Sequence, residues 1–185
     1  LAALPTKTRY MVNKAQKYGL ELVPGTLNDL ETFQTLKAET AARDGIAHLP
    51  FNDIKEIFST VLNEGRGTFN LVRLNPAKTL PVLKGDLEHW QQDLERAMRK
   101  KKPNPNYLQD VKNSIAKLEA QIAELEALAG QKPEGVFLSA AICTHMGDKT
   151  MYYMAASSDS FRDYFPNYLM LWSFITEAKQ RGSTL

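Results

Sequence analysis

Two heptad-patterned segments, separated by a short proline-rich break, constrain this sequence more than any other feature. In each segment apolar residues recur at alternating spacings of three and four, which is the a/d pattern of helices that pair along one stripe. The first set is Leu83, Leu87, Trp90, Leu94 and Ala97, and the second is Leu108, Val111, Ile115, Leu118, Ile122 and Leu125. The connection KKKPNPN between them is short, so the two helices must fold back on each other. The pattern predicts an antiparallel coiled-coil arm over residues 78–132, about 30 Å long for helices of about 20 residues.

The tip of this predicted arm carries a run of cations, Arg99, Lys100, Lys101 and Lys102, just before Pro103. Elsewhere in the arm carboxylates balance the basic residues, so the positive charge is concentrated at the tip. Two interpretations stay open at this point. The run is either a solvated turn that keeps the arm soluble or a contact to the phosphates of a nucleic acid.

The segments on either side of the arm alternate between helical and strand patterns. Helices are predicted over 6–18, 28–40, 53–62 and 167–181, and strands over 20–24, 67–74, 136–145 and 150–158. The expected N-caps are Thr6 or Thr8 for the first helix and Asn52 or Asp53 for the third, with residues 42–50 as a loop. This order predicts a mixed α/β (α+β) globule that carries the arm as a long insertion.

Composition excludes several classes of protein. The 185 residues include 23 basic and 21 acidic side chains, so the overall charge gives no reason to expect a general polyanion binder. No apolar run approaches the roughly 18–20 residues that span a bilayer. The lone Cys143 rules out an intrachain disulfide and fits a reducing compartment. Because the chain lacks an initiating Met and ends abruptly after Gly182, we expect a fragment of a longer protein.

The residue types that carry metal or nucleophilic chemistry are scattered. His48, His89 and His145 lie far apart, with no Cys or acidic partner at metal-ligand spacing. Cys143 lies in an apolar strand and is expected to be a buried, inert thiol. The sequence contains no P-loop, nucleophile elbow or GxGxxG motif. We therefore expect neither a metal nor a cofactor.

The stretch YYMAASSDSFRDYFPNY, residues 152–168, combines aromatic rings with hydroxyl-bearing and small residues. Most of these rings could simply pack in the core. Its hydroxyl-bearing and small residues nevertheless lie at the end of a predicted strand, where α/β sheets commonly admit ligands. Both the packing role and a role as the wall of a binding site stay open.

Three blocks of the sequence resemble the Fem aminoacyltransferases, the FemABX family. They are KTRYMVNKAQKYGLEL, FQTLKAETAARDGI and MYYMAASSDSFRDYFPNYLMLWSFITEAKQRG, and the coiled-coil arm is typical of the FemA-like branch. The resemblance implies the second of two GNAT-like domains, with a mixed sheet and flanking helices. It assigns residues 1–77 and 133–185 to that domain, truncated at both ends, and residues 78–132 to the arm.

The resemblance also implies a function, the transfer of an amino acid from aminoacyl-tRNA to the peptide of a lipid-linked or UDP-linked peptidoglycan precursor. This would take place in the cytoplasm, with a peripheral association with the inner face of the membrane. Arg99–Lys102 would contact tRNA, because the arm resembles that of seryl-tRNA synthetase. The residues expected to line the cleft are Tyr152, Ser157 and Tyr168, with Arg43 and Asp44. This segment alone is expected to be inactive.

Two alternatives belong to other functional classes. One is a non-catalytic scaffold whose arm binds a partner protein. The other is an acyl-CoA acetyltransferase, which is disfavoured because the sequence lacks the glycine-rich pyrophosphate loop between strand and helix.

Overall fold

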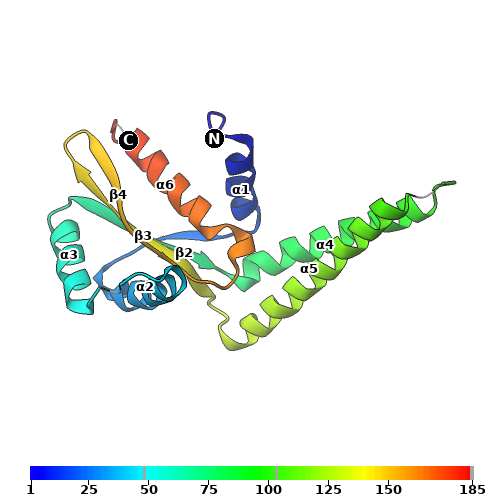
Figure 1. Cartoon of the computed structure of the whole chain (residues 1–185), viewed down its shortest axis with the longest axis horizontal. Helices are drawn as coiled ribbons and strands as arrows, with labels where there is room; N and C mark the ends of the chain where they lie inside the picture. The colour runs from blue at the N-terminus through cyan, green and yellow to red at the C-terminus, as the bar shows by residue number, and fades with distance from the viewer. Residues whose placement is uncertain (48, 103, 184–185) are drawn as a thin grey trace. The chain divides into compact units, whose positions relative to one another are not determined.

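The structure is a computed structural model that describes residues 1–47, 49–102 and 104–183 (Figure 1). It divides into two compact units. The first joins Leu1–Leu74 to the chain from Val136 onward, and the second is Asn75–Gly135. The second unit therefore enters the sequence between two strands of the first.

A four-stranded sheet in the order β1-β2-β3-β4 organises the first unit. The strands are β1 (Glu21–Pro24), β2 (Gly67–Leu74), β3 (Val136–Met146) and β4 (Lys149–Ser157). Every pairing among them is antiparallel, and the register aligns Val72 with Ser139 and Ser139 with Ser157. Gly147, whose φ of 61° suits glycine, lies in the turn between β3 and β4. β4 thus lies at one edge of the sheet.

One face of the sheet is covered by α2 (Leu30–Asp44) and α3 (Phe51–Asn63) (Figure 1). A short 3₁₀ helix, Leu27–Asp29, leads into α2. The core on this face centres on Phe33, Phe58 and Phe69, whose ring centroids lie 4.8–6.0 Å apart in tilted or edge-on contact. Because three different elements contribute one ring each, this aromatic cluster ties α2, α3 and β2 together.

The opposite face is covered by α6 (Pro166–Gln180), and α1 (Thr6–Lys17) packs against α6 (Figure 1). Met170 and Phe174 of α6 are buried, as are Val12 and Ala15 of α1. A second 3₁₀ helix, Arg162–Tyr164, connects β4 to α6.

The second unit is an antiparallel pair of helices, α4 (Pro76–Met98) and α5 (Pro105–Gln131). Both begin with proline at the first helical position, after an asparagine whose side chain accepts backbone hydrogen bonds. Lys84 and Glu126 form an ion pair of 2.7 Å between the two helices. Six of the predicted a/d residues are buried, namely Leu83, Ala97, Val111, Leu118, Ile122 and Leu125.

The predicted fold class and the inserted antiparallel hairpin are confirmed, and so is the order of elements. Two local predictions were wrong. The second long helix extends through Asp44 and ends at Gly45, whose φ is 65°, so residues 42–44 are helical and do not belong to a loop. The predicted N-caps make no capping bond, because Pro5 and Pro50 occupy the N-cap positions and the chain is already helical at Thr6 and Phe51. Within the described ranges, no helix is both long enough and apolar enough to cross a bilayer.

Candidate functional site

A small cavity of about 240 Å³ lies where β4 leads into α6. Its polar lining comes from Ser158, Arg162, Asn167 and Tyr168, and Met11 of α1 contributes to its apolar side. The backbone here is unusual, because Phe161 and Phe165 adopt left-handed conformations with φ of 54° and 59°. Conformations of this kind are uncommon for bulky residues and persist only when surrounding contacts hold them.

Contacts from α2 hold the β4 end of this cavity. The Ser157 amide donates to Thr40 Oγ1 at 3.0 Å, and that hydroxyl lies 3.2 Å from the Ser157 carbonyl oxygen. The same hydroxyl lies 2.9 Å from the Leu36 carbonyl oxygen. Thr40 therefore accepts from the outward-facing amide of the last residue of β4, which an edge strand would otherwise leave without a partner, and its single hydroxyl proton can reach either the Leu36 or the Ser157 carbonyl.

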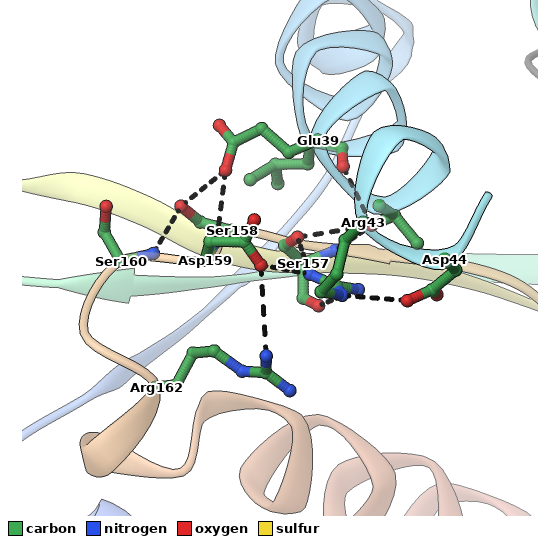
Figure 2. Close-up of polar contacts among 10 residues, drawn as sticks. Glu39, Arg43, Asp44, Ser157, Ser158, Asp159, Ser160 and Arg162 are labelled. Atoms are coloured by element: carbon green, nitrogen blue, oxygen red, sulfur yellow. Dashed lines mark hydrogen bonds and ion pairs between the residues drawn. The ribbon is translucent and has the colours of Figure 1, made fainter.

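Glu39 fixes the turn that follows β4 (Figure 2). One of its carboxylate oxygens accepts from the Ser158 hydroxyl at 2.8 Å and from the Asp159 amide at 3.1 Å. The Ser160 amide in turn donates to the Ser158 hydroxyl at 3.2 Å. Because Glu39 and Ser160 already engage Ser158, this hydroxyl is a rigid polar part of the cavity wall.

Arg43 completes the network on the other side of the turn (Figure 2). Its guanidinium donates to Asp159 at 2.7 Å, to Asp44 at 3.0 Å and to the Ser157 carbonyl at 3.3 Å. The hydrogen bond to Asp159, and secondly the one to Asp44, raise the pKa of Arg43 above its ordinary value. Asp159 also lies 3.9 Å from Arg162, so the network reaches the lining of the cavity.

Lys14 lies close to the same turn. Its ammonium lies 5.5–5.6 Å from the ring centroids of Tyr10, Tyr18 and Phe165. Burial acts to lower its pKa, but the charge interactions and hydrogen bonds with Tyr18 and Tyr10 outweigh burial, so the pKa is raised. Lys14 thus stays charged and links α1 to Phe165, which precedes α6.

A second, larger cavity of about 550 Å³ lies between α3 and the β3–β4 hairpin. Its lining combines apolar side chains, such as Ile57, Val61 and Met151, with polar and charged residues that include Glu56, Arg66 and His145. His145 Nε2 lies 3.3 Å from Glu177, and His145 Nδ1 lies 3.2 Å from Thr150 Oγ1. Burial lowers the pKa of His145, as does Arg181, although Glu177 acts in the opposite direction. Nδ1 of the imidazole therefore has a hydrogen-bond partner, whereas the buried Nε2 lies near Glu177 without a hydrogen bond, and the lowered pKa favours the neutral ring.

Comparisons with known proteins decide the family. The sequence profile of the FemAB family matches residues 1–185, the whole chain. The chain belongs to the FemAB family. This confirms the resemblance drawn from the sequence.

Relatives of this FemAB chain include the Lipid II:glycine glycyltransferase of Staphylococcus aureus, which is 31% identical over 191 residues. That alignment covers 100% of this chain and 45% of the relative. The protein of the same name from strain bovine RF122 / ET3-1 is 31% identical over 185 residues, with coverages of 96% and 44%. A crystal structure of FemX superposes with a TM-score of 0.71 at 30% identity, over 97% of this chain and 46% of the FemX chain. The FemAB chain thus spans less than half the length of these relatives.

The predicted site residues of this FemAB chain fall into three places. Arg43, Asp44 and Ser157 come together in the network beside β4, where Ser157 is buried and hydrogen-bonded through its backbone. Tyr168 lies on the wall of the small cavity. Tyr152 lines neither of the two cavities; its ring lies edge-on to Phe174, with centroids 5.7 Å apart.

Burial affects two groups on the α6 face of the sheet. It raises the pKa of the Tyr152 hydroxyl to about 12, with a smaller effect of Cys143, although 39% of the Tyr152 residue is exposed. Burial likewise raises the pKa of the Cys143 thiol to about 12, with a smaller contribution from Glu177. The thiol is therefore protonated at neutral pH, as expected for an inert buried cysteine.

Sequence reasoning missed Glu39, Thr40, Ser158 and Arg162. The only signal for Ser158 was its place in the run SSDS after a strand, since Ser and Asp often form side-chain turns to nearby backbone amides. Nothing local indicated Glu39 or Thr40, because their partners lie more than a hundred residues further along the chain.

The four cations of the predicted arm tip lie at the end of α4. Arg99 to Lys102 are all exposed, and Arg99 contacts Glu95 at 3.3 Å. Cations are favourable after the last turn of a helix, where the helix dipole is negative. This placement is compatible with both interpretations of the tip.

Among the described residues, no group of three or more His, Cys, Asp or Glu side chains is arranged to hold a metal ion. His48, one of the histidines considered above, lies outside the described residues.

Proposed function

We propose that the protein carrying this chain transfers an amino acid from aminoacyl-tRNA to the peptide of a peptidoglycan precursor, in the synthesis of the interpeptide bridge. The supporting observation is membership of the FemAB family over the whole chain, together with relatives named Lipid II:glycine glycyltransferase. The reaction would take place in the cytoplasm, with the protein peripheral to the inner face of the membrane when the precursor is lipid-linked.

The proposed reaction needs positioning more than it needs a nucleophilic side chain. The acceptor amine attacks the carbonyl carbon of the aminoacyl ester, a C–N bond forms, and the C–O bond to the ribose breaks. The amine loses a proton and the departing ribose oxygen gains one. Because the ester is already activated, the protein must align amine and ester, accept the proton and stabilise the oxyanion.

The small cavity at the start of α6 has features that suit part of this task. Tyr168 and Arg162 present a hydroxyl and a cation, and Ser158 is held rigidly by Glu39. We propose that Tyr168 contacts the acceptor and that Arg43, Asp44 and Ser157 position the turn beside it. Tyr152, which lies on β4 together with Ser157, would act at the edge of the cleft.

The arm tip is the proposed contact for the tRNA donor. Four exposed cations within four residues can each approach a phosphate, and such contacts release counterions. The variant Lys100→Ala/Lys101→Ala/Lys102→Ala should therefore weaken tRNA binding, most strongly at low salt, and leave the melting temperature unchanged. Equal affinity of variant and wild type at both low and moderate salt would exclude this contact.

The activity is tested with the full-length protein, a mixture of charged tRNAs, and both lipid-linked and nucleotide-linked muropeptides. Transfer of a radiolabelled amino acid to a muropeptide is the expected result. Absence of transfer to every acceptor, from protein that is folded by circular dichroism, would refute the proposal. The variant Tyr168→Ala should raise KM for the muropeptide about tenfold, as expected when one hydrogen bond and one ring contact are removed. The exposed-site variant Lys55→Ala on α3 serves as its matched control.

A further inference from the structure

The charges of the first unit are divided between the two faces of its sheet. Helices α2 and α3 on one face carry five carboxylates and three cations, whereas α1 and α6 on the other carry one carboxylate and five cations. The five cations are Lys7, Arg9, Lys14, Lys17 and Lys179. The single carboxylate, Glu177, is already bonded to Thr68 and Arg181. The helices of this face, called the basic face below, therefore carry a net charge of +4, although the whole chain is nearly neutral.

The composition of α1 is responsible for most of this charge. The helix has four cations in 12 residues and contains no Asp or Glu. Its buried side consists of Val12 and Ala15, and on the side away from them Tyr10 and Lys17 are exposed. Tyr10 is 56% exposed, more than the other exposed aromatic residues Phe51, Tyr107, Tyr152 and Tyr153.

We propose that the basic face binds the surface of an anionic lipid bilayer. Lys7 and Lys17 of α1 and Lys179 of α6 are exposed and would approach the lipid phosphates. Tyr10 and Leu171, which is 42% exposed, would lie at the level of the headgroups, where tyrosine is favoured. This proposal rests on the proposed function in one respect, because a lipid-linked acceptor would bring the protein to a membrane. The adsorption itself does not require transferase activity.

An anionic membrane suits this surface better than a second RNA site does. The phosphate backbone of an RNA would pair with the lysines but would leave Leu171 without an apolar partner. A bilayer interface accepts cations together with isolated apolar and aromatic side chains. Because the apolar side of α1 is already packed against the protein, α1 has no free stripe to insert into the lipid. The contact is therefore a shallow, electrostatic adsorption that salt should weaken.

Vesicle co-sedimentation of the full-length protein tests this inference. Vesicles of phosphatidylcholine mixed with phosphatidylglycerol should bind the protein at low salt, and vesicles of phosphatidylcholine alone should not. Each cation near an anionic surface contributes about fivefold in affinity. The variant Lys7→Gln/Lys17→Gln/Lys179→Gln, which removes three of them, should therefore bind these vesicles on the order of 100-fold more weakly than the wild type. The matched control is Lys100→Gln/Lys101→Gln/Lys102→Gln, which removes the same charge from the arm and should keep vesicle binding.

Several results would overturn the proposal. One is equal binding of the wild-type protein to both vesicle types, and another is equal vesicle affinity of the basic-face variant and the wild type. A third is a basic-face variant that loses tRNA binding but keeps vesicle binding, which would assign the basic face to RNA. Wild-type binding that does not fall with added salt would also contradict it, and this measurement needs no variant. Because the vesicles contain no precursor, adsorption without transferase activity would refute the proposed function alone, and activity without adsorption would refute this inference alone.

Discussion

The helical arm and the sheet-bearing unit are built from contacts of different range. In the arm, the a/d side chains recur at spacings of three and four along the sequence, as in the buried Leu118, Ile122 and Leu125, and α4 and α5 contact each other. In the sheet-bearing unit, the contacts that shape the candidate site join distant residues, such as Glu39 and Ser158, which are 119 residues apart. A repeating local pattern therefore specifies the arm, whereas the site exists only after the sheet and α2 have assembled.

This difference has a consequence for how each region should unfold. The two-helix arm is a separate compact unit, so a defect in it should remain local. The aromatic cluster of the other unit connects α2, α3 and β2, so a defect there should spread to every element that depends on the sheet. Substitutions in the two regions can test this contrast.

The largest effect is expected for Phe58→Ala. Phe58 is fully buried and contacts both Phe33 and Phe69, so its removal leaves a cavity at the centre of the cluster. We expect a loss of about 3–5 kcal/mol in the free energy of unfolding, measured by urea denaturation. The control Phe58→Leu should lose less than half as much. A loss below about 1 kcal/mol for the alanine variant would mean that the cluster does not hold the three elements together.

A smaller and local effect is expected for Leu118→Ala in the arm. Leu118 is 7% exposed at the contact between two helices, so the cavity can partly open to solvent. We expect a loss of about 2–3 kcal/mol that appears as faster amide hydrogen exchange in α4 and α5. Exchange in the four strands should not change. The exposed neighbouring variant Glu119→Ala is the control, and faster exchange in β2 or β3 would contradict the independence of the two units.

The same contrast explains what could be predicted from the sequence. The heptads of residues 83–125 contain their own partners, so the antiparallel hairpin followed from spacing and from the short connection. The strands and helices of the other unit were also predicted in the correct order, because alternation and helical periodicity are local signals. The C-terminal end of α2 at Asp44 was missed, because the composition of ARDGIAHLP is typical of a loop. The hydrogen bonds of Arg43 to Asp159 and Ser157, which join distant residues, are not visible in the local sequence.

The candidate site was only partly predictable for the same physical reason. The aromatic and hydroxyl-rich composition near β4 indicated that region, and Tyr168 does line a cavity there. Tyr152 is also a tyrosine, but its position in β4 places its side chain on the face of the sheet that packs against Phe174 of α6. Composition identifies a segment, whereas the strand register and the packing of α2 decide which of its side chains meet.

An intermediate effect is expected for Thr40→Val, which keeps the size of the side chain but removes its hydroxyl. Thr40 is buried, and its hydroxyl accepts from the Ser157 amide at the edge of the sheet. Without it, this buried amide loses its partner, so we expect a loss of about 1–3 kcal/mol in the free energy of unfolding.

The matched control for this variant is Thr35→Val on the same helix. Thr35 is exposed, and its hydroxyl bonds only to the Glu31 carbonyl one turn earlier. Its loss should change stability by no more than about 0.5 kcal/mol. Equal losses for the two variants would mean that the long-range contact of Thr40 contributes nothing beyond its local helix bond.

The smallest effect is the dependence of stability on pH that His145 confers. Burial and Arg181 lower the folded-state pKa of His145 below its ordinary value of 6.5, so protonation is harder in the folded protein than in the unfolded chain. The contribution of the neutral imidazole is fully present above pH 6.5 and is lost as the pH falls through the lower folded-state pKa. The variant His145→Gln removes this titration, so the stability difference between wild type and variant should be larger at pH 7.5 than at pH 5. His89→Gln, at an exposed position of the arm, is the control for removing an imidazole. A difference that stays constant or grows toward pH 5 would mean that Glu177 dominates and that His145 is charged in the folded protein.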